Sequence, residues 1–283
     1  MLDRPTLTGS EPDAGLNRLQ SLVQLFNDYL AMTKPPIVVL LLFTAIGGMF
    51  LAAQAVPPWH LALLVCLGGA LGAGGANALN HYLDQDIDEK MSRTARRPLP
   101  GNRVAPRNAL IFGIVLNVAA FLILGAWVNL LAAFLTLAAT LFYVFVYTMW
   151  LKRTTPQNIV IGGAAGAIPP MVGWVAITGS LDLPALYMFT IIFFWTPPHF
   201  WALAIMIKDD YARADIPMLP VVHGVEYTSS QILLYTAVLT ALTILFGTVA
   251  DALGLTYMIG AAVLGGAFLW YAYRLRHEPG RPA

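Results

Sequence analysis

The sequence predicts an all-α membrane protein, a bundle of about eight transmembrane helices. Hydrophobic residues make up 58% of its 283 residues and charged residues only 11%, a composition typical of membrane proteins. Eight apolar segments each approach the roughly 20 residues that a helix needs to cross a bilayer core. The segments are continuously apolar and do not alternate as barrel strands would, so we expect helices.

The apolar segments also predict where the chain crosses the membrane. All sixteen Lys and Arg fall in the N-terminal tail, the connections after the second, fourth and sixth spans, or the C-terminal tail. Basic residues mark cytoplasmic loops, so we expect both termini on the cytoplasmic side of a bacterial-type inner membrane. The predicted spans are 36–53, 59–79, 109–128, 130–150, 158–178, 185–207, 231–250 and 253–273.

Three parts are expected along the chain. Residues 1–33 form a cytoplasmic tail, within which the tract 16–32 has helical apolar spacing and is predicted to lie along the membrane interface. Residues 34–274 form the transmembrane domain, and 275–283 a cytoplasmic C-terminal tail. The net charge of +1 gives no indication of a nucleic-acid partner, and the single cysteine excludes a disulfide framework.

A row of oxygen-bearing side chains follows the second span. Asn80, Asp84 and Asp88 recur every four residues, so on a helix they rise along one face. Such ligands suit Mg²⁺, which prefers oxygen and shares its coordination with waters and substrate phosphates. Asp86 points to the other side and is expected to pair with an arginine. Cations follow at once, so we predict a metal-bridged diphosphate: Lys90, Arg93, Arg96 and Arg97.

A second group of acids and cations follows the sixth span, and there Asp210 is a better ligand candidate than Asp209. Because both groups occur at the same membrane depth, we expect their helices to face each other across one cavity. His199, near the same interface, is either a structural residue, a proton handler or an axial iron ligand.

Several stretches carry a family resemblance. They include ALNHYLDQDIDEKMSRTARRPLP from Ala78, FWTPPHFWALAI from Phe194 and DDYARADIPMLPVVHG from Asp209. Over about residues 28–250 the chain resembles the membrane-intrinsic, UbiA-type prenyltransferase superfamily. Within it, the chain is most similar to the protoheme IX farnesyltransferase branch, the haem O synthases.

This resemblance implies a prenyltransferase domain over 34–274, with helices around a central cavity and cytoplasmic loops that cap it. Mg²⁺ at Asn80, Asp84, Asp88 and Asp210 would bind farnesyl diphosphate and make these residues catalytic. The vinyl group of haem b would take the farnesyl group and, with water, give haem O. A haem A synthase or an oxidase assembly factor is a further expected partner. The residues implied for substrate binding are Arg93, Arg96, Arg97 and Lys208 for the diphosphate and His199 for haem.

Three features depart from the family pattern. Met206 stands four residues before Asp210 in place of a second aspartate, and Asp215 stands where glycine is expected. The family typically has nine spans, whereas about eight are predicted here. Two alternatives remain open at this point: prenylation of a quinone or other aromatic acceptor, and a membrane transporter, whose broken helices and intramembrane acids would look similar.

Overall fold

The computed structural model describes residues 14–250 and 252–277, and every regular element in these ranges is a helix. The elements in chain order are α1 (Ala14–Thr33), α2 (Pro35–Ala53), α3 (Trp59–Leu83), α4 (Gln85–Lys90), α5 (Pro106–Trp127), α6 (Leu130–Leu141), the π-helix η1 (Phe142–Leu151), α7 (Lys152–Thr154), α8 (Asn158–Gly166), α9 (Pro169–Thr178), α10 (Leu183–Met206), α11 (Lys208–Arg213), α12 (Leu219–Val222), α13 (Gly224–Val249) and α14 (Leu255–His277).

Eight helical spans are long and apolar enough to cross a membrane, which confirms the predicted number. They are α2, α3, α5, α10, α13 and α14, together with two composite spans, Leu130–Thr154 and Asn158–Thr178. The chain is therefore an integral membrane protein. The described residues hold one span fewer than the nine of the family pattern.

Several spans extend beyond their predicted ends, and two of them do so beside the polar connections. Helix α3 continues past residue 79 to Leu83, and α13 begins at Gly224 where the apolar pattern begins only at 231. In the polar first turns of α13, buried hydroxyl groups are satisfied by carbonyl groups of the same helix. The Thr228 hydroxyl donates to the Gly224 carbonyl at 2.7 Å, and that of Ser229 donates to the Glu226 carbonyl at 2.9 Å.

Close backbone contacts join neighbouring spans. Helix α2 packs along α9, α3 along α5, and α13 between α10 and α14. The approach of α2 to α9 requires glycine, since a Cβ added to Gly173 would lie 1.8 Å from the Ala45 carbonyl oxygen. A Cβ on Gly48 would lie 2.2 Å from the Pro170 carbonyl oxygen, so both helices depend on small residues at the crossing.

The proline pairs act differently in the two spans that carry them. The fifth span is interrupted before Pro169 and Pro170, so that α8 and α9 are separate helices. Helix α10 instead continues through Pro197 and Pro198. The fourth span contains a deviation that the sequence did not predict, since its last ten residues before α7 are wound as the π-helix η1.

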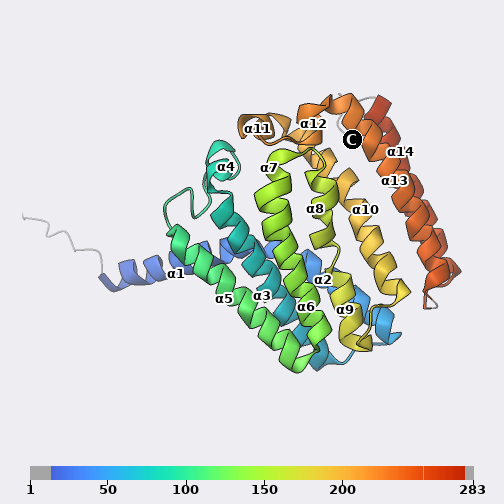
Figure 1. The fold of residues 1–283 in the computed structure, drawn as a ribbon, viewed down its shortest axis with the longest axis horizontal. Helices are drawn as coiled ribbons and strands as arrows, with labels where there is room; N and C mark the ends of the chain where they lie inside the picture. The colour runs from blue at the N-terminus through green and yellow to red at the C-terminus, as the bar shows by residue number, and fades with distance from the viewer. Residues whose placement is uncertain (1–13, 251, 278–283) are drawn as a thin grey trace, which may run out of the picture.

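The short helices gather at one end of the bundle. Figure 1 shows α4, α11 and α12 at this end, where α3 finishes and α13 begins. We call it the polar end, and define it by residues 80–105, 148–153 and 207–224 together with Lys34. It carries both connections that the sequence singled out.

Helix α1 confirms that the predicted tract 16–32 is helical. Many of its exposed side chains are apolar, while Asp28 and Met32 are buried against the bundle. The interfacial position of α1 and the division at residues 33 and 274 stay predictions, and residues 1–13 and 278–283 of the two tails lie outside the described residues. The exposed large apolar side chains of α1 are Leu19, Leu22, Val23, Leu25, Phe26 and Leu30.

Candidate active site at the polar end

Asn80 and Asp84 form the centre of the site. Asp84 is the residue at which α3 ends, one turn beyond Asn80, and the Asn80 amide donates to Asp84 Oδ2 at 2.6 Å. Both side chains are buried, with residue exposures of 3% and 1%. The predicted spacing of four residues thus places these two groups in contact. Asp88, equally buried, lies on α4 beyond a break in the helix at Asp84.

Two neighbouring cations at the end of the fourth span lie against Asp84. The Lys152 ammonium lies 2.5 Å from Oδ2, and an Arg153 guanidinium nitrogen lies 3.8 Å from Oδ1. Oδ1 accepts no hydrogen bond from the described residues, although the side chain is only 1% exposed. A buried carboxylate oxygen without a donor is costly unless something else coordinates it, so this atom fits a metal ion.

Lys34 approaches the pair from the junction of α1 and α2. Its ammonium donates to Asn80 Oδ1 at 2.8 Å, and its backbone is left-handed, with φ of 54°. Burial, followed by the positive charges of Arg97 and Lys152, lowers the pKa of Lys34 from 10.5 to about 7. A left-handed backbone conformation is strained for a lysine, and strain of this kind is found at functional sites.

The π-helix supplies a further wall. The Thr148 hydroxyl, fully buried, accepts from the Asn80 amide at 3.2 Å. Tyr143 and Tyr147 stack with ring centroids 5.4 Å apart. Gly162 of α8 allows Tyr147 to pack close, because an added Cβ would lie 2.2 Å from its ring.

Asp88 is held by one of the predicted arginines. Arg97 Nη1 lies 2.7 and 2.8 Å from the two carboxylate oxygens, and the Thr94 hydroxyl donates to the Asp88 carbonyl at 2.9 Å. The Asp88 side chain is 3% exposed, so its charge depends on Arg97. A guanidinium already beside the acidic row is well placed to meet an anion bound there.

Asp86 confirms the expectation that it pairs with an arginine. Both of its oxygens accept from Arg153, at 2.7 and 2.8 Å, and this bond holds the pKa of the exposed Asp86 carboxyl below its usual value. Asp86 therefore ties α4 to the end of the fourth span.

Side chains of the second acidic group, after the sixth span, bond to side chains of the connection after the second span. The Ser92 hydroxyl lies 3.0 Å from Asp210 Oδ2, and Arg213 also pairs with Asp210. Lys90 lies 3.1 Å from Asp215. Asp215 has φ of 56°, the conformation for which glycine is favoured, which explains the glycine expected there.

The remaining predicted residues are exposed or half-buried, and the partners that the described residues offer them differ from Asn80 and Asp84. Arg93 is exposed and bonds to Tyr211, and Arg96 is exposed, while the half-buried Lys208 begins α11. His199 is half-buried and stacks on Trp195 with ring centroids 4.3 Å apart. Among the described residues no three His, Cys, Asp or Glu side chains form a metal cluster, so the ligand set of Asn80, Asp84, Asp88 and Asp210 stays a prediction.

Sequence reasoning missed four residues that contact Asn80 or Asp84. They are 46 to 69 positions from their partners in the sequence: Lys34, Thr148, Lys152 and Arg153. One signal was available, since Lys34 and the Lys152–Arg153 pair adjoin spans on the face that carries the motif. Which motif residue they touch depends on how the spans pack.

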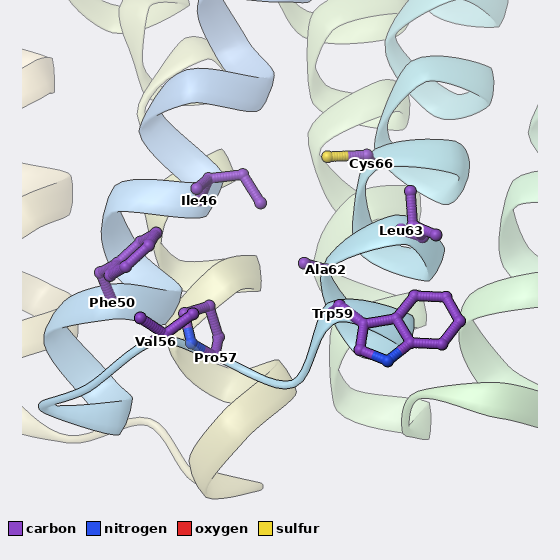
Figure 2. A pocket seen from close by; sticks show the side chains of 8 residues that line it. All are labelled: Ile46, Phe50, Val56, Pro57, Trp59, Ala62, Leu63 and Cys66. Atoms are coloured by element: carbon purple, nitrogen blue, oxygen red, sulfur yellow. The ribbon is translucent and has the colours of Figure 1, made fainter.

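A separate apolar cavity lies at the opposite end of α2 and α3. Its volume is about 390 Å³, and Figure 2 shows side chains from both helices and their connecting loop around it. Its lining residues carry no charge, so it offers nothing to hold a diphosphate. They include Ile46, Phe50, Val56, Trp59, Leu63 and Cys66.

Comparison with known proteins identifies the family. Residues 41–283 match the UbiA prenyltransferase family. The chain belongs to the UbiA prenyltransferase family. Membership of this family confirms the superfamily resemblance and favours a prenyltransferase over the transporter alternative.

Relatives within the family share one name. Proteins named protoheme IX farnesyltransferase are 52% identical over 260 residues in Roseiflexus sp. and 53% identical over 256 residues in Alkalilimnicola ehrlichii. These alignments cover 92% and 90% of this chain, and the branch resemblance is thereby confirmed. The chain spans about half of the Roseiflexus protein, 48%, and 84% of the Alkalilimnicola protein.

Solved structures share the fold at low sequence identity. A digeranylgeranylglyceryl phosphate synthase superposes with a TM-score of 0.74 and 18% identity, covering 90% of this chain and 89% of its own. A UbiA homologue from Archaeoglobus fulgidus bound to DMAPP and Mg²⁺ has a TM-score of 0.71 and 17% identity, covering 88% and 87%. These UbiA-type neighbours confirm the predicted fold class.

Proposed function

We propose that this UbiA-family protein transfers the farnesyl group of farnesyl diphosphate to the vinyl group of haem b and so makes haem O. The observation that carries the proposal is the buried Asn80–Asp84 pair, with an unfilled carboxylate oxygen and cations around it, at the polar end of a membrane bundle. The choice of haem as acceptor is supported by the name shared by relatives about 50% identical.

Asn80, Asp84, Asp88 and Asp210 would hold Mg²⁺, which supplies Lewis-acid stabilisation of the diphosphate leaving group. The amide and carboxylate oxygens of this set are the donors that Mg²⁺ prefers, and Oδ1 of Asp84 is free to coordinate. The fold neighbour from Archaeoglobus fulgidus, bound to Mg²⁺ and the prenyl diphosphate DMAPP, supports metal-assisted chemistry.

The cations of the site would stabilise the charge that develops on the leaving group. Arg97 and Lys152 already lie against Asp88 and Asp84, and Lys34 lies against Asn80. Donors fixed in a site that excludes water stabilise a developing anion far better than the same groups in water. Arg93, Arg96 and Lys208 are the outer members of this set.

The reaction breaks the bond between C1 of the farnesyl chain and the diphosphate oxygen, and the electron pair leaves with the diphosphate. The π electrons of the vinyl group form a new carbon–carbon bond to C1. Water then adds to the resulting cation and loses a proton, which gives the hydroxyethylfarnesyl group. We propose that His199, stacked on Trp195, meets the haem.

We infer that the polar end faces the cytoplasm of a bacterial inner membrane, because the Lys and Arg residues gather there and at the termini. Haem O is too apolar to leave the membrane readily, so the protein would hand it to a haem A synthase or an oxidase assembly factor in the same bilayer. In this proposal residues 34–274 form the prenyltransferase domain.

The test is a product assay. Membranes that contain the full chain are incubated with haem b and farnesyl diphosphate, with and without Mg²⁺, and haem O is measured by chromatography and mass spectrometry. We expect Mg²⁺-dependent haem O. Its absence, with prenylation of an added quinone instead, would establish the aromatic-acceptor alternative and overturn haem as the substrate.

A further inference from the structure

Arg103 joins helix α1 to the segment that carries Arg97. Its Nε donates to Asp28 Oδ1 at 2.9 Å, and its Nη2 donates to the Arg96 carbonyl oxygen at 3.1 Å. One guanidinium therefore bonds in two directions, toward α1 and toward the residue next to Arg97. The planar guanidinium holds its Nε–H and Nη2–H donors in a fixed geometry that suits these two acceptors.

The α1 side of this link is buried. The Asp28 side chain is 6% exposed, so removal of Arg103 would leave a buried charge without its partner. Apolar contacts seat the same segment on α1, where Leu99 and Val104 pack with Met32. The segment 97–104 is therefore anchored to helix α1 by one ion pair and by apolar packing.

Residues 97–103 form a tight turn, which fixes the backbone of Arg97 relative to Arg103. The Gly101 amide donates to the Arg97 carbonyl at 2.9 Å, and the Arg103 amide donates to the Pro98 carbonyl at 2.9 Å. A Cβ on Gly101 would lie 2.6 Å from Arg103 Nη1 and 3.0 Å from the Arg97 carbonyl oxygen. Glycine at this position thus leaves room for the Arg103 guanidinium against the turn.

We infer that Asp28 and Arg103 are positioning residues that hold the Arg97 guanidinium at the diphosphate site. Within the described residues, the hydrogen bonds of Asp28 and Arg103 reach neither Asp88 nor Asn80. The two residues act through the backbone of Arg96 and the turn that follows Arg97. The inference rests on the proposed function, because Arg97 is assigned there to the diphosphate. A purely structural role would leave binding of the diphosphate unchanged in folded protein.

The first experiment measures binding of farnesyl thiodiphosphate, a slowly ionising analogue, to the detergent-solubilised full chain with Mg²⁺. We expect Asp28→Asn to weaken binding about five- to tenfold. The matched control is Asp215→Asn, which removes an aspartate from an exposed ion pair at the same end and keeps a residue that tolerates its left-handed φ. Thermal unfolding of each variant shows that the protein compared is folded.

A double-mutant cycle identifies Arg97 as the intermediary. If Asp28 acts through Arg97, Asp28→Asn will cause no further loss of binding in an Arg97→Ala background, whereas independent effects would add. Additive losses, or unchanged binding by Asp28→Asn alone, would overturn the inference. Failure of the wild-type protein to bind the analogue would overturn the proposed function and this inference with it.

A second variant covers the case in which Asp28→Asn does not fold. Arg103→Lys keeps the positive charge beside Asp28 but removes the rigid planar fork that bonds the carboxylate and the Arg96 carbonyl in a fixed geometry. We expect it to weaken binding of the analogue about fivefold while it retains the unfolding temperature of the wild type within a few degrees. Wild-type affinity in this variant would contradict the positioning role.

Discussion

The two acidic groups of the polar end have the same residue types but different surroundings. Asp84 and Asp88 of the first group have side chains 1% and 3% exposed, and each is paired with a cation. Asp210 of the second group lies on a six-residue helix with its side chain 12% exposed, next to Ser92 and an exposed Arg213. Both Asp88 and Asp210 lie on six-residue helices, so the difference lies in burial: Asp84 and Asp88 are enclosed together with their cations, whereas Asp210 stays nearer the surface.

The largest effect is expected from Asp84→Asn, which tests whether the buried group is the metal side of the site. Asparagine keeps the shape of the side chain but removes the charge that would hold Mg²⁺, so haem O formation should fall about a thousandfold. Product is measured by mass spectrometry. Near-wild-type turnover by a folded Asp84→Asn protein would contradict the metal role.

Lys152→Met should have the next largest effect, because it leaves the Asp84 carboxylate without its nearest cation. Breaking one side of a buried pair typically costs about 3 kcal/mol, so we expect a lower unfolding temperature as well as lower activity. The double variant Lys152→Met with Asp84→Asn should recover part of the lost stability, as followed by thermal unfolding in detergent. No recovery would mean that the two side chains are not coupled.

Asp210→Asn should have a smaller effect than Asp84→Asn, since the Asp210 side chain is more exposed. We expect about a tenfold loss of activity at low Mg²⁺ that a higher Mg²⁺ concentration largely restores. The measurement is a Mg²⁺ titration of the haem O rate. An effect as large as that of Asp84→Asn would show that both groups hold the metal equally.

Asp86→Asn should have the smallest effect, because the exposed Asp86 pairs with Arg153 outside the buried row. Stability should change by less than about 1 kcal/mol, and turnover by less than about twofold. The folded-state pKa of Asp86 is depressed from 3.8, so its contribution is present above pH 4 and lost as the pH falls through the folded pKa. The difference in stability between wild type and variant should therefore be smaller at pH 3 than at pH 6.

Contacts close in sequence were predictable, and distant ones were not. The spacing of Asn80 and Asp84 predicted their contact, because residues four apart share a helix face. The bonds from Lys34 and Thr148 to Asn80 were missed, since no periodicity relates residues 46 and 68 positions apart. Asp86 was predicted to pair with an arginine, but that the partner is Arg153 follows from the packing of the fourth span against α3.

The sequence by itself determined the membrane spans and the residue types of the site. Long apolar runs can satisfy their backbone in lipid only as helices, and acids beside cations at one membrane face already indicate a polyanion. Only the tertiary structure decided which cation meets which acid, and that α1 supports the Arg97 segment through Asp28 and Arg103. The reason is physical: apolar composition fixes what enters the membrane, whereas side-chain pairing depends on how the spans rotate and pack against one another.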